Sequence, residues 1–184
     1  MQMIRVLTIA ALTALSFNAQ SADKDSFWYW GIGYNGQSLD SGDYGSFGVS
    51  LAEVKFGLAQ KSGFAYEGYL LTGVSDDKRQ GQNGDEYTAN AGFGWGARAI
   101  YKKPINNQFA LFGSGGISQV NYEFDIDKPL FSGNDSESYF GANLGVGISL
   151  IVATDVEVKA GYEAFMLSGD DKLTGFNVSI NSYF

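Results

Sequence analysis

The sequence contains no cysteine and no histidine among its 184 residues. Without cysteine, the chain has no disulfide framework and no thiolate metal site. Without histidine, it lacks the residue that serves Ser-His and Asp-His catalysis, binds zinc and titrates near neutral pH. We therefore expect no enzymatic activity, no bound metal and no cofactor.

Basic residues are outnumbered as well. The chain carries 12 Lys and Arg against 20 Asp and Glu, which gives a formal net charge of −8. Proteins that bind nucleic acids cluster Lys and Arg against the phosphate backbone. We expect no nucleic-acid partner for this chain.

Proline and long apolar runs are also rare, whereas glycine and aromatic residues are common. There are 2 Pro, 25 Gly and 15% aromatic residues. No segment after residue 22 offers the ~20 apolar residues that a membrane-spanning helix needs, and each glycine costs about 1 kcal/mol in a helix interior. Glycine mixed with aromatic residues favours a curved, twisted sheet instead.

The N-terminus is predicted to be a secretory signal peptide over residues 1–22. Arg5 gives a basic start, residues 6–15 form a short apolar run, and residues 19–22 supply small side chains for cleavage. A buried N-terminal helix is the alternative, but the composition changes abruptly at Asp23. We expect export, with the folded domain spanning residues 23–184.

The rest of the chain alternates between apolar and small or polar residues, which is the period of a β-strand. The clearest stretch is residues 87–101, where aromatic residues flank small ones on the apolar face, as in strands that cross a bilayer. The residues of this predicted outward face are Tyr87, Ala89, Ala91, Phe93, Trp95, Ala97, Ala99 and Tyr101. Over the whole chain, the predicted membrane aromatic girdle consists of Trp28, Trp30, Tyr87, Trp95, Tyr101, Phe140 and Tyr162.

Eight such segments predict an all-β fold, an eight-stranded antiparallel up-and-down transmembrane β-barrel. The predicted strands are residues 26–35, 46–60, 63–74, 86–102, 108–123, 138–152, 155–167 and 174–184. The second strand changes the parity of its apolar residues near Ala52. Either a β-bulge lies there, or Phe47, Val49 and Leu51 point into the barrel.

The predicted connections alternate in length. Residues 60–63, 103–107 and 153–155 form short turns, whereas residues 35–44, 75–85, 124–137 and 168–173 form longer polar loops. In outer-membrane barrels the short turns are periplasmic and the long loops are extracellular. An even number of strands then places both termini on the periplasmic side.

The last strand alternates through Phe176, Val178 and Ile180 to the terminal Phe184, with Ser182 as a polar exception. This end resembles the insertion signal that outer-membrane barrels present to the barrel-assembly machinery. Together with the aromatic first strand at residues 27–34 and the segment at residues 64–69, it resembles the small OmpA/OmpX-type outer-membrane β-barrel superfamily. The resemblance implies a monomer in the outer membrane of a Gram-negative cell, without the peptidoglycan-binding domain of OmpA-type proteins.

Charged residues on the inward parity are the first candidate site. They are Glu53, Lys55, Glu67, Arg98, Glu157, Lys159 and Glu163. An eight-stranded barrel is just wide enough for side chains to fill it, and buried charges must be paired. The set predicts either a closed polar plug or the lining of a narrow pore, with Glu67 and Arg98 as a central pair.

The acidic loops are the second candidate. Carboxylates in these loops could hold Ca²⁺ or Mg²⁺. No loop shows the ligand spacing of an EF-hand, so we expect solvated loops. Lys78 and Arg79 could instead contact lipid phosphates. The loop acids are Asp40, Asp43, Asp76, Asp77, Asp85, Glu86, Asp125, Asp127, Asp135, Glu137, Asp170 and Asp171. The G-x-G-x-x-G match at residues 31–36 lies within a strand and precedes no helix, so it predicts no nucleotide site.

Two functions remain open from the sequence. The first is a structural and surface-interaction protein, whose barrel anchors acidic loops that contact lipopolysaccharide and other surfaces. The second is a narrow porin-like channel or a transporter for ions, small solutes or apolar ligands. A soluble lipocalin-like barrel is disfavoured, because the charged faces must point inward and the apolar faces outward into lipid.

Overall fold

The computed structural model describes residues 25–41, 45–80, 86–128, 131–167 and 172–184. The predicted signal peptide at residues 1–22 lies outside the described residues. No helix in the described part of the chain is long and apolar enough to cross a membrane.

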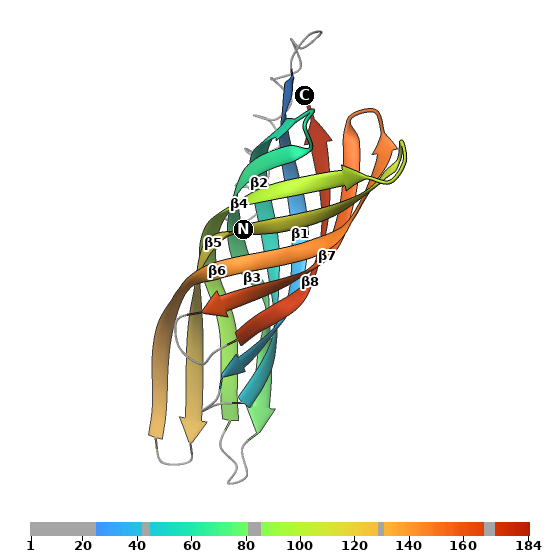
Figure 1. Ribbon diagram of the computed structural model, residues 1–184. Helices are drawn as coiled ribbons and strands as arrows, with labels where there is room; N and C mark the ends of the chain where they lie inside the picture. Colours follow the sequence, from blue (N-terminus) through green and yellow to red (C-terminus); the bar gives the residue numbers. More distant parts are fainter. Residues whose placement is uncertain (1–24, 42–44, 81–85, 129–130, 168–171) are drawn as a thin grey trace.

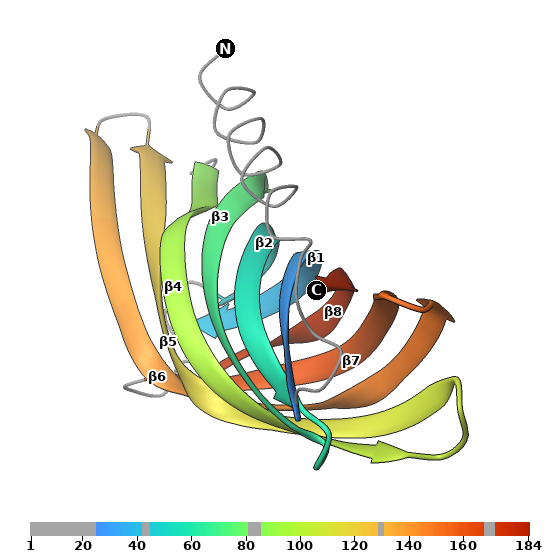
Figure 2. The ribbon, with the colours of Figure 1, turned by 90° about the horizontal axis from the view of Figure 1, so that it is seen from above.

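Eight antiparallel strands form one closed barrel, in which β8 pairs back with β1. Figure 1 shows the strands inclined around a common axis, and Figure 2 shows β8 returning beside β1. The predicted eight-stranded barrel is therefore confirmed. The strands are β1 (Ser26–Ser41), β2 (Gly45–Gln60), β3 (Phe64–Gln80), β4 (Glu86–Pro104), β5 (Phe109–Lys128), β6 (Phe131–Ala153), β7 (Val156–Leu167) and β8 (Lys172–Tyr183).

The two ends of the barrel differ in how far the strands extend. At one end, called the turn end here, short turns join β2 to β3, β4 to β5 and β6 to β7. The C-terminus lies at the turn end, where the Phe184 amide donates to the Trp28 carbonyl at 2.9 Å. At the opposite end, called the loop end, the β3–β4 and β5–β6 hairpins reach well past β1–β2 and β7–β8 (Figure 1).

Most of the predicted long loops are strand. Residues 35–41, 75–80, 124–128 and 131–137 continue β1, β3, β5 and β6, and the β5–β6 ladder reaches Lys128↔Phe131. The sequence of these extensions is rich in polar residues, as in Ser75-Asp76-Asp77-Lys78, so it was read as loop although the strands continue. The prediction of loops at residues 35–44, 75–85 and 124–137 was therefore wrong over the parts that are strand. Of the fourth segment, residues 168–171 lie outside the described residues.

The two wall faces have the chemistry that the alternation predicted. Outward side chains are large and apolar, such as Leu144 at 53% and Val146 at 66% exposure, and inward side chains in the same strand are polar, such as Asn143 at 3%. Exposed apolar surface on this scale would be a liability in water. In a bilayer it is the favourable arrangement.

The second strand has no change of parity. Phe47, Val49, Leu51, Glu53 and Lys55 are all buried on the inward face. The irregularity in the β2–β3 ladder falls between Ser50 and Leu51, but the extra residue is on β3, since Ser50 pairs with Ser75 and Leu51 with Gly73. The part of β2 nearest the loop end therefore points its apolar side chains inward, which was the second of the two predicted possibilities.

A bulge does interrupt β4, where none was predicted. The β4–β5 register shifts between Ala91 and Gly94, so the outward face changes parity at this point. Trp95 and Tyr101 face outward as expected, at 42% and 48% exposure, but Ala89 is fully buried in the barrel. Residues 87–101 are thus not one continuous outward face, and the side chain of Tyr87 lies outside the described part.

Aromatic side chains gather near both edges of the apolar band. Near the turn end, Trp28 stacks on Phe56 with ring centroids 5.1 Å apart, and Phe64 contacts Tyr101 at 4.9 Å. Toward the loop end, the Trp95 indole donates to Gln119 Oε1 at 3.1 Å. The other predicted girdle residues show the following exposures: Phe140 at 50%, Tyr162 at 54% and Trp30 half-buried.

Candidate functional site in the barrel lumen

The inward side chains form three layers along the barrel. Charged and amide side chains occupy the middle, and apolar side chains lie toward the loop end and toward the turn end. We call the middle layer the lumen charge network and define it by eight residues. These are Glu53, Lys55, Glu67, Arg98, Lys102, Glu157, Lys159 and Glu163.

Arg98 is the hub of this network. Its guanidinium pairs with Glu67 through Nε, with Glu163 through Nη1 at 2.5 Å, and with Glu53 through Nη2 at 3.1 Å. A planar guanidinium offers a fixed fork of donors, which suits it to hold several carboxylates at once. Arg98 and Glu67 are directly paired across the β3–β4 ladder, so the two residues predicted as a central pair do lie together.

The network is completed by two lysines and a tyrosine around Glu67 and Glu53. Lys159 Nζ lies 3.3 Å from Glu67 Oε2, and Lys55 Nζ lies 2.9 Å from Glu53 Oε1. The Tyr29 hydroxyl donates to Glu67 Oε2 at 2.6 Å. Both carboxylates are thus held by more than one donor, which offsets the cost of removing them from water.

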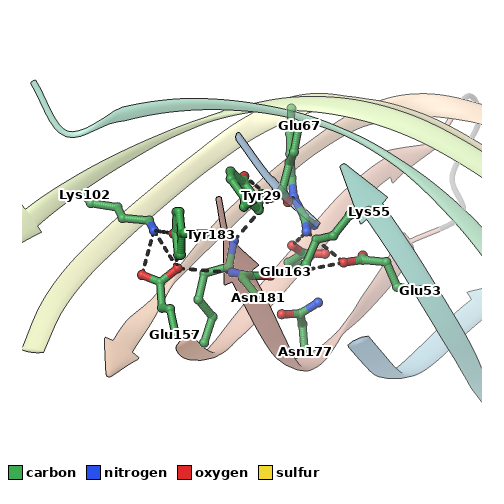
Figure 3. A network of polar contacts seen from close by, with 12 residues as sticks. Tyr29, Glu53, Lys55, Glu67, Lys102, Glu157, Glu163, Asn177, Asn181 and Tyr183 are labelled. Atoms are coloured by element: carbon green, nitrogen blue, oxygen red, sulfur yellow. Dashed lines mark hydrogen bonds and ion pairs between the residues drawn. The ribbon is translucent and has the colours of Figure 1, made fainter. Parts of the chain in front are cut away.

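A second group of polar side chains lies nearer the turn end and contains Lys102, which was not among the predicted lumen charges. Lys102 Nζ lies 2.6 and 2.7 Å from the two oxygens of Glu157, and the Tyr183 hydroxyl donates to Glu157 at 2.6 Å. Asn181 Nδ2 also donates to Glu157, at 3.1 Å. Figure 3 shows Lys102, Tyr183 and Asn181 around Glu157, with Glu67 and Glu163 of the other group nearby.

Lys102 and Tyr183 could have been found from parity alone. Lys102 continues the inward alternation of Arg98 and Ile100, and Tyr183 continues that of Asn181. Adding Lys102 makes the network four carboxylates and four basic side chains, so it carries no net charge. A neutral, internally paired network is what a closed plug requires, because an excess charge in the lumen would need a counter-ion.

An apolar layer closes the lumen on the loop-end side of the network. Tyr69 lies at the boundary, where the Arg98 guanidinium sits 4.7 Å from its ring centroid and Asn143 Nδ2 donates to its hydroxyl at 2.7 Å. Gly96 makes room for this ring, because a Cβ there would collide with it. The layer consists of Phe47, Val49, Leu51, Tyr69, Leu71, Ala89, Val120, Tyr122, Tyr139, Phe165 and Leu173.

A smaller apolar group closes the turn-end side. It contains Tyr29, Ala65, Ile100 and Phe112, with Tyr183 packed against it. The rings of Tyr29 and Tyr183 lie 5.2 Å apart and join the first and last strands of the barrel. The Arg98 group therefore lies between two apolar groups. Lys102 pairs in register with Phe112, so the Lys102–Glu157 pair lies level with the turn-end group, where the Lys102 side chain is 16% exposed.

The acidic residues near the loop end form no metal site in the described part of the chain. No group of three or more His, Cys, Asp or Glu side chains there could hold an ion. Four of the twelve predicted loop acids, Asp43, Asp85, Asp170 and Asp171, lie outside the described residues. Asp77 is described, and it accepts a hydrogen bond from the Gly48 amide at 2.8 Å.

A family of outer-membrane proteins matches almost the whole sequence. The family described as "Outer membrane protein beta-barrel domain" matches residues 7–184. The chain belongs to this family. It is therefore an outer-membrane β-barrel protein, as the aromatic strands and the C-terminal alternation had suggested, and by the rule for such barrels its turn end faces the periplasm.

Solved structures agree on the fold. Neisserial surface protein A is similar at 14% identity and a TM-score of 0.61, with 88% of this chain and 100% of that chain covered. Ail, the attachment invasion locus protein of Yersinia pestis, is similar at 16% identity and a TM-score of 0.59, with the same coverage. The N-terminal barrel of Pseudomonas aeruginosa OprF is similar at 12% identity and a TM-score of 0.55, covering 88% and 98%. No curated protein sequence matches the chain significantly.

Proposed function

We propose that this barrel is a closed membrane anchor that presents a surface-exposed sheet to a partner, and that it is neither a channel nor an enzyme. The observation that carries the proposal is the filled lumen. The Arg98 group of the charge network lies between two apolar groups whose side chains are almost fully buried. An ion on this path would lose its water in the apolar layers without gaining partners there, at a cost of several kcal/mol.

The part of the barrel left for function is its loop end. There, residues of β3 to β6 continue as a sheet beyond the rim formed by β1, β2, β7 and β8 (Figure 1). Pairing of β6 with β7 begins only at Gly141↔Leu167. Within the described strands, the backbone of residues 131–138 therefore pairs with β5 on one side and offers its other side as an edge.

The β7–β8 connection is too short to cover this edge. It comprises the four residues 168–171, which span at most about 14 Å when fully extended. The edge of residues 131–138 is roughly 26 Å long at about 3.3 Å per residue. A free strand edge of this kind binds an extended segment of another protein by adding a strand to the sheet.

The charge of the edge indicates the kind of segment it would take. Residues 131–138 include Asp135 and Glu137 and no basic residue. We therefore propose an extended segment rich in Lys or Arg as the partner. Ail has been solved in complex with a heparin analogue, sucrose octasulfate, but the acidic balance of this chain disfavours a sulfated ligand.

Single-channel recording tests the closed lumen. The mature protein is refolded into planar bilayers beside the Glu67→Gln and Arg98→Ala variants. A closed anchor gives no steady conductance in the wild type. Steady conductance that changes with either substitution would assign the protein to the narrow-channel alternative.

Hydrogen exchange tests the edge. The probe is a strand-forming peptide of alternating Lys and Thr, and its control has the same length with Pro at every second Thr, which removes the donors of the ladder. We expect the Lys-Thr peptide to slow amide exchange in residues 131–138 and the Pro-containing peptide to leave it unchanged. Equal effects of the two peptides would mean that charge alone attracts them and that no strand is added.

A further inference from the structure

An open pocket lies on the outer wall of the barrel near the loop end, across β1, β2, β7 and β8. Its volume is about 500 Å³, which falls within the ~300–1,000 Å³ of pockets that hold small molecules. We call it the rim pocket. The side chains that border it on the outward face include Tyr34, Ser38, Ser50, Tyr162, Thr174 and Phe176.

Strand pairing gives the rim pocket a floor of small residues. Gly36 of β1 pairs with Ser50 of β2 on one side and with Phe176 of β8 on the other. One step nearer the loop end, Ser38 pairs with Thr174. The Phe176 ring lies against Gly36, where a Cβ would collide with it. The pocket is therefore hollow because short side chains lie beside large rings.

Three aromatic rings border this floor. Tyr34, Tyr162 and Phe176 are 43%, 54% and 52% exposed on the outer wall. The rings of Tyr34 and Phe176 lie 6.1 Å apart, measured between centroids, and Tyr162 pairs in register with Phe176. The pocket thus offers aromatic surface from three strands to a ligand.

Hydroxyl groups border the same floor. The Tyr34 hydroxyl and Ser50 Oγ share a hydrogen bond of 2.6 Å, and Ser38 and Thr174 add two further hydroxyls. A hydroxyl donates one hydrogen bond and accepts two, so one bond between two hydroxyls leaves capacity for a ligand. Among the described residues that line the pocket, none is charged.

The rim pocket lies across the boundary of the apolar band. Toward the loop end, the outward face of β1 changes from Ile32 and Tyr34 to Ser38, and that of β8 changes from Val178 to Thr174. Because the loop end of such a barrel faces the exterior, this boundary belongs to the outer leaflet, at the level where aromatic residues meet lipid head groups. A ligand with its chains in the lipid would therefore place its head group in the pocket.

We propose that the rim pocket binds one neutral sugar ring of an outer-leaflet glycolipid. The C–H groups on one face of a pyranose ring pack against aromatic rings, and its hydroxyls pair with those of serine, threonine and tyrosine. Phosphate and sulfate head groups fit less well, because proteins hold them with Lys and Arg. This site goes beyond the proposed anchor function and does not depend on the partner of the β6 edge.

The glycines of the floor report on binding directly. The refolded full chain, isotope-labelled on glycine, is studied by NMR spectroscopy in phosphatidylcholine nanodiscs that contain either monoglucosyl diacylglycerol or diacylglycerol, which lacks the sugar. We expect the glucosyl lipid to shift the amide resonances of Gly36 and Gly48. The matched controls are Gly68 and Gly113, which are exposed on the outward face elsewhere and should not shift. No shift, equal shifts at all four glycines, or equal shifts with the two lipids would overturn the proposal.

Ring variants test the aromatic border. Tyr162→Leu and Phe176→Leu keep an apolar side chain toward the lipid but remove the ring, and we expect each to weaken the response to the glucosyl lipid several-fold. Tyr66→Leu is the matched control, because Tyr66 is 52% exposed on β3 outside the pocket and should leave the response unchanged. Unchanged resonances of Gly68 and Gly113 show that each variant is folded. An equal response in all three variants would contradict binding against these rings.

Hydroxyl variants and a soluble sugar complete the test. Tyr34→Phe/Ser50→Ala removes the hydroxyl pair and keeps the ring, and a several-fold weaker response to the glucosyl lipid is expected. Methyl glucoside carries the same sugar without the chains that hold it at the boundary, so it should not shift Gly36 and Gly48. A wild-type response of the double variant would rule out sugar recognition by these hydroxyls. A response to methyl glucoside equal to that of the glycolipid would assign the pocket to a soluble sugar and overturn the glycolipid.

Discussion

Lys102 and Glu157 face each other across the lumen from β4 and β7, with Lys102 Nζ within 2.7 Å of both carboxylate oxygens. The Tyr183 hydroxyl joins the same carboxylate, so three strands meet at one ion pair. Because β8 closes the barrel against β1, this group ties the closing strand to the opposite wall. It forms fully only when all eight strands are in place.

Removing one member of this pair should therefore weaken the closed barrel. We expect Glu157→Gln to lower the free energy of unfolding by about 1.5–3 kcal/mol, the range for a hydrogen bond to a charged group. Lys102→Met should cost a similar amount, because it leaves the carboxylate with fewer donors. Urea titration in phospholipid vesicles measures both, and the Lys102→Met/Glu157→Gln double variant should lose less than the sum of the two single losses.

Arg98 should be the most costly position in the lumen. Its replacement by Ala leaves Glu53, Glu67 and Glu163 without their shared partner, and breaking a buried ion pair on one side costs about 3–5 kcal/mol. Arg98→Lys keeps the charge but offers no planar fork, so we expect an intermediate loss. The same urea titration gives the order wild type, Lys, Ala; a wild-type stability for Arg98→Ala would show that the network is hydrated and not closed.

Two tyrosines on β3 point to opposite faces of the barrel wall. Tyr69 is 3% exposed inside the barrel, and Tyr66 is 52% exposed outside it. Tyr69→Ala should cost about 3–5 kcal/mol, the range for an aromatic side chain removed from a packed core, and it leaves Asn143 without its acceptor. Tyr66→Ala serves as the control, with an expected loss well below that of Tyr69→Ala. Similar losses for the two variants would contradict a packed apolar layer.

Alternating residues along β6 predict which face tolerates charge. Leu144 lies near the middle of the outward apolar face and is 53% exposed. Leu144→Arg should destabilise the protein by about 2–4 kcal/mol in vesicles, as expected for arginine on the lipid face near the bilayer midplane. The control is Ser136→Arg, at an exposed position of the same strand beyond the membrane, where we expect little change. Equal effects would place the apolar band elsewhere.

The sequence predicted the fold well where one face of a strand meets lipid. Phe140, Leu144 and Ile148 alternate with small or polar residues, because lipid and the lumen impose opposite demands on the two faces. Residues 124–137 are mostly polar and were predicted to be a loop, although residues 124–128 and 131–137 are paired strand. Pairing of backbone groups, which any side chain allows, extends the strands there.

The sequence predicted the charged residues of the lumen but not its apolar layers. Parity assigned Glu67 and Arg98 to the inside, where they are buried. It failed at Ala89, because one extra residue in β4 exchanges the two faces and the small residues Ala89, Ala91 and Gly92 leave no change of parity that would mark the bulge. Lys102 was omitted although it lies within the predicted strand 86–102 and shares the parity of Arg98.

The C-terminal phenylalanine allows the predicted insertion signal to be separated from the closing group next to it. Phe184 lies 6.3 Å from Phe56 on the outer wall, measured between ring centroids, whereas the Tyr183 hydroxyl binds Glu157 in the lumen.

If the barrel-assembly machinery recognises the outward aromatic end, Phe184→Ala should lower the amount of protein in the outer membrane of expressing cells several-fold. It should change the stability of the purified, refolded protein little. Tyr183→Phe should do the opposite, because it keeps the ring but removes the hydroxyl that donates to Glu157 and accepts from Lys102. Hydrogen bonds to charged groups contribute about 1.5–3 kcal/mol each. Quantitative blotting of membrane fractions, set beside urea titration of the refolded variants, distinguishes the two. A Phe184→Ala protein that reaches the membrane at the wild-type level would assign no role in insertion to the terminal residue.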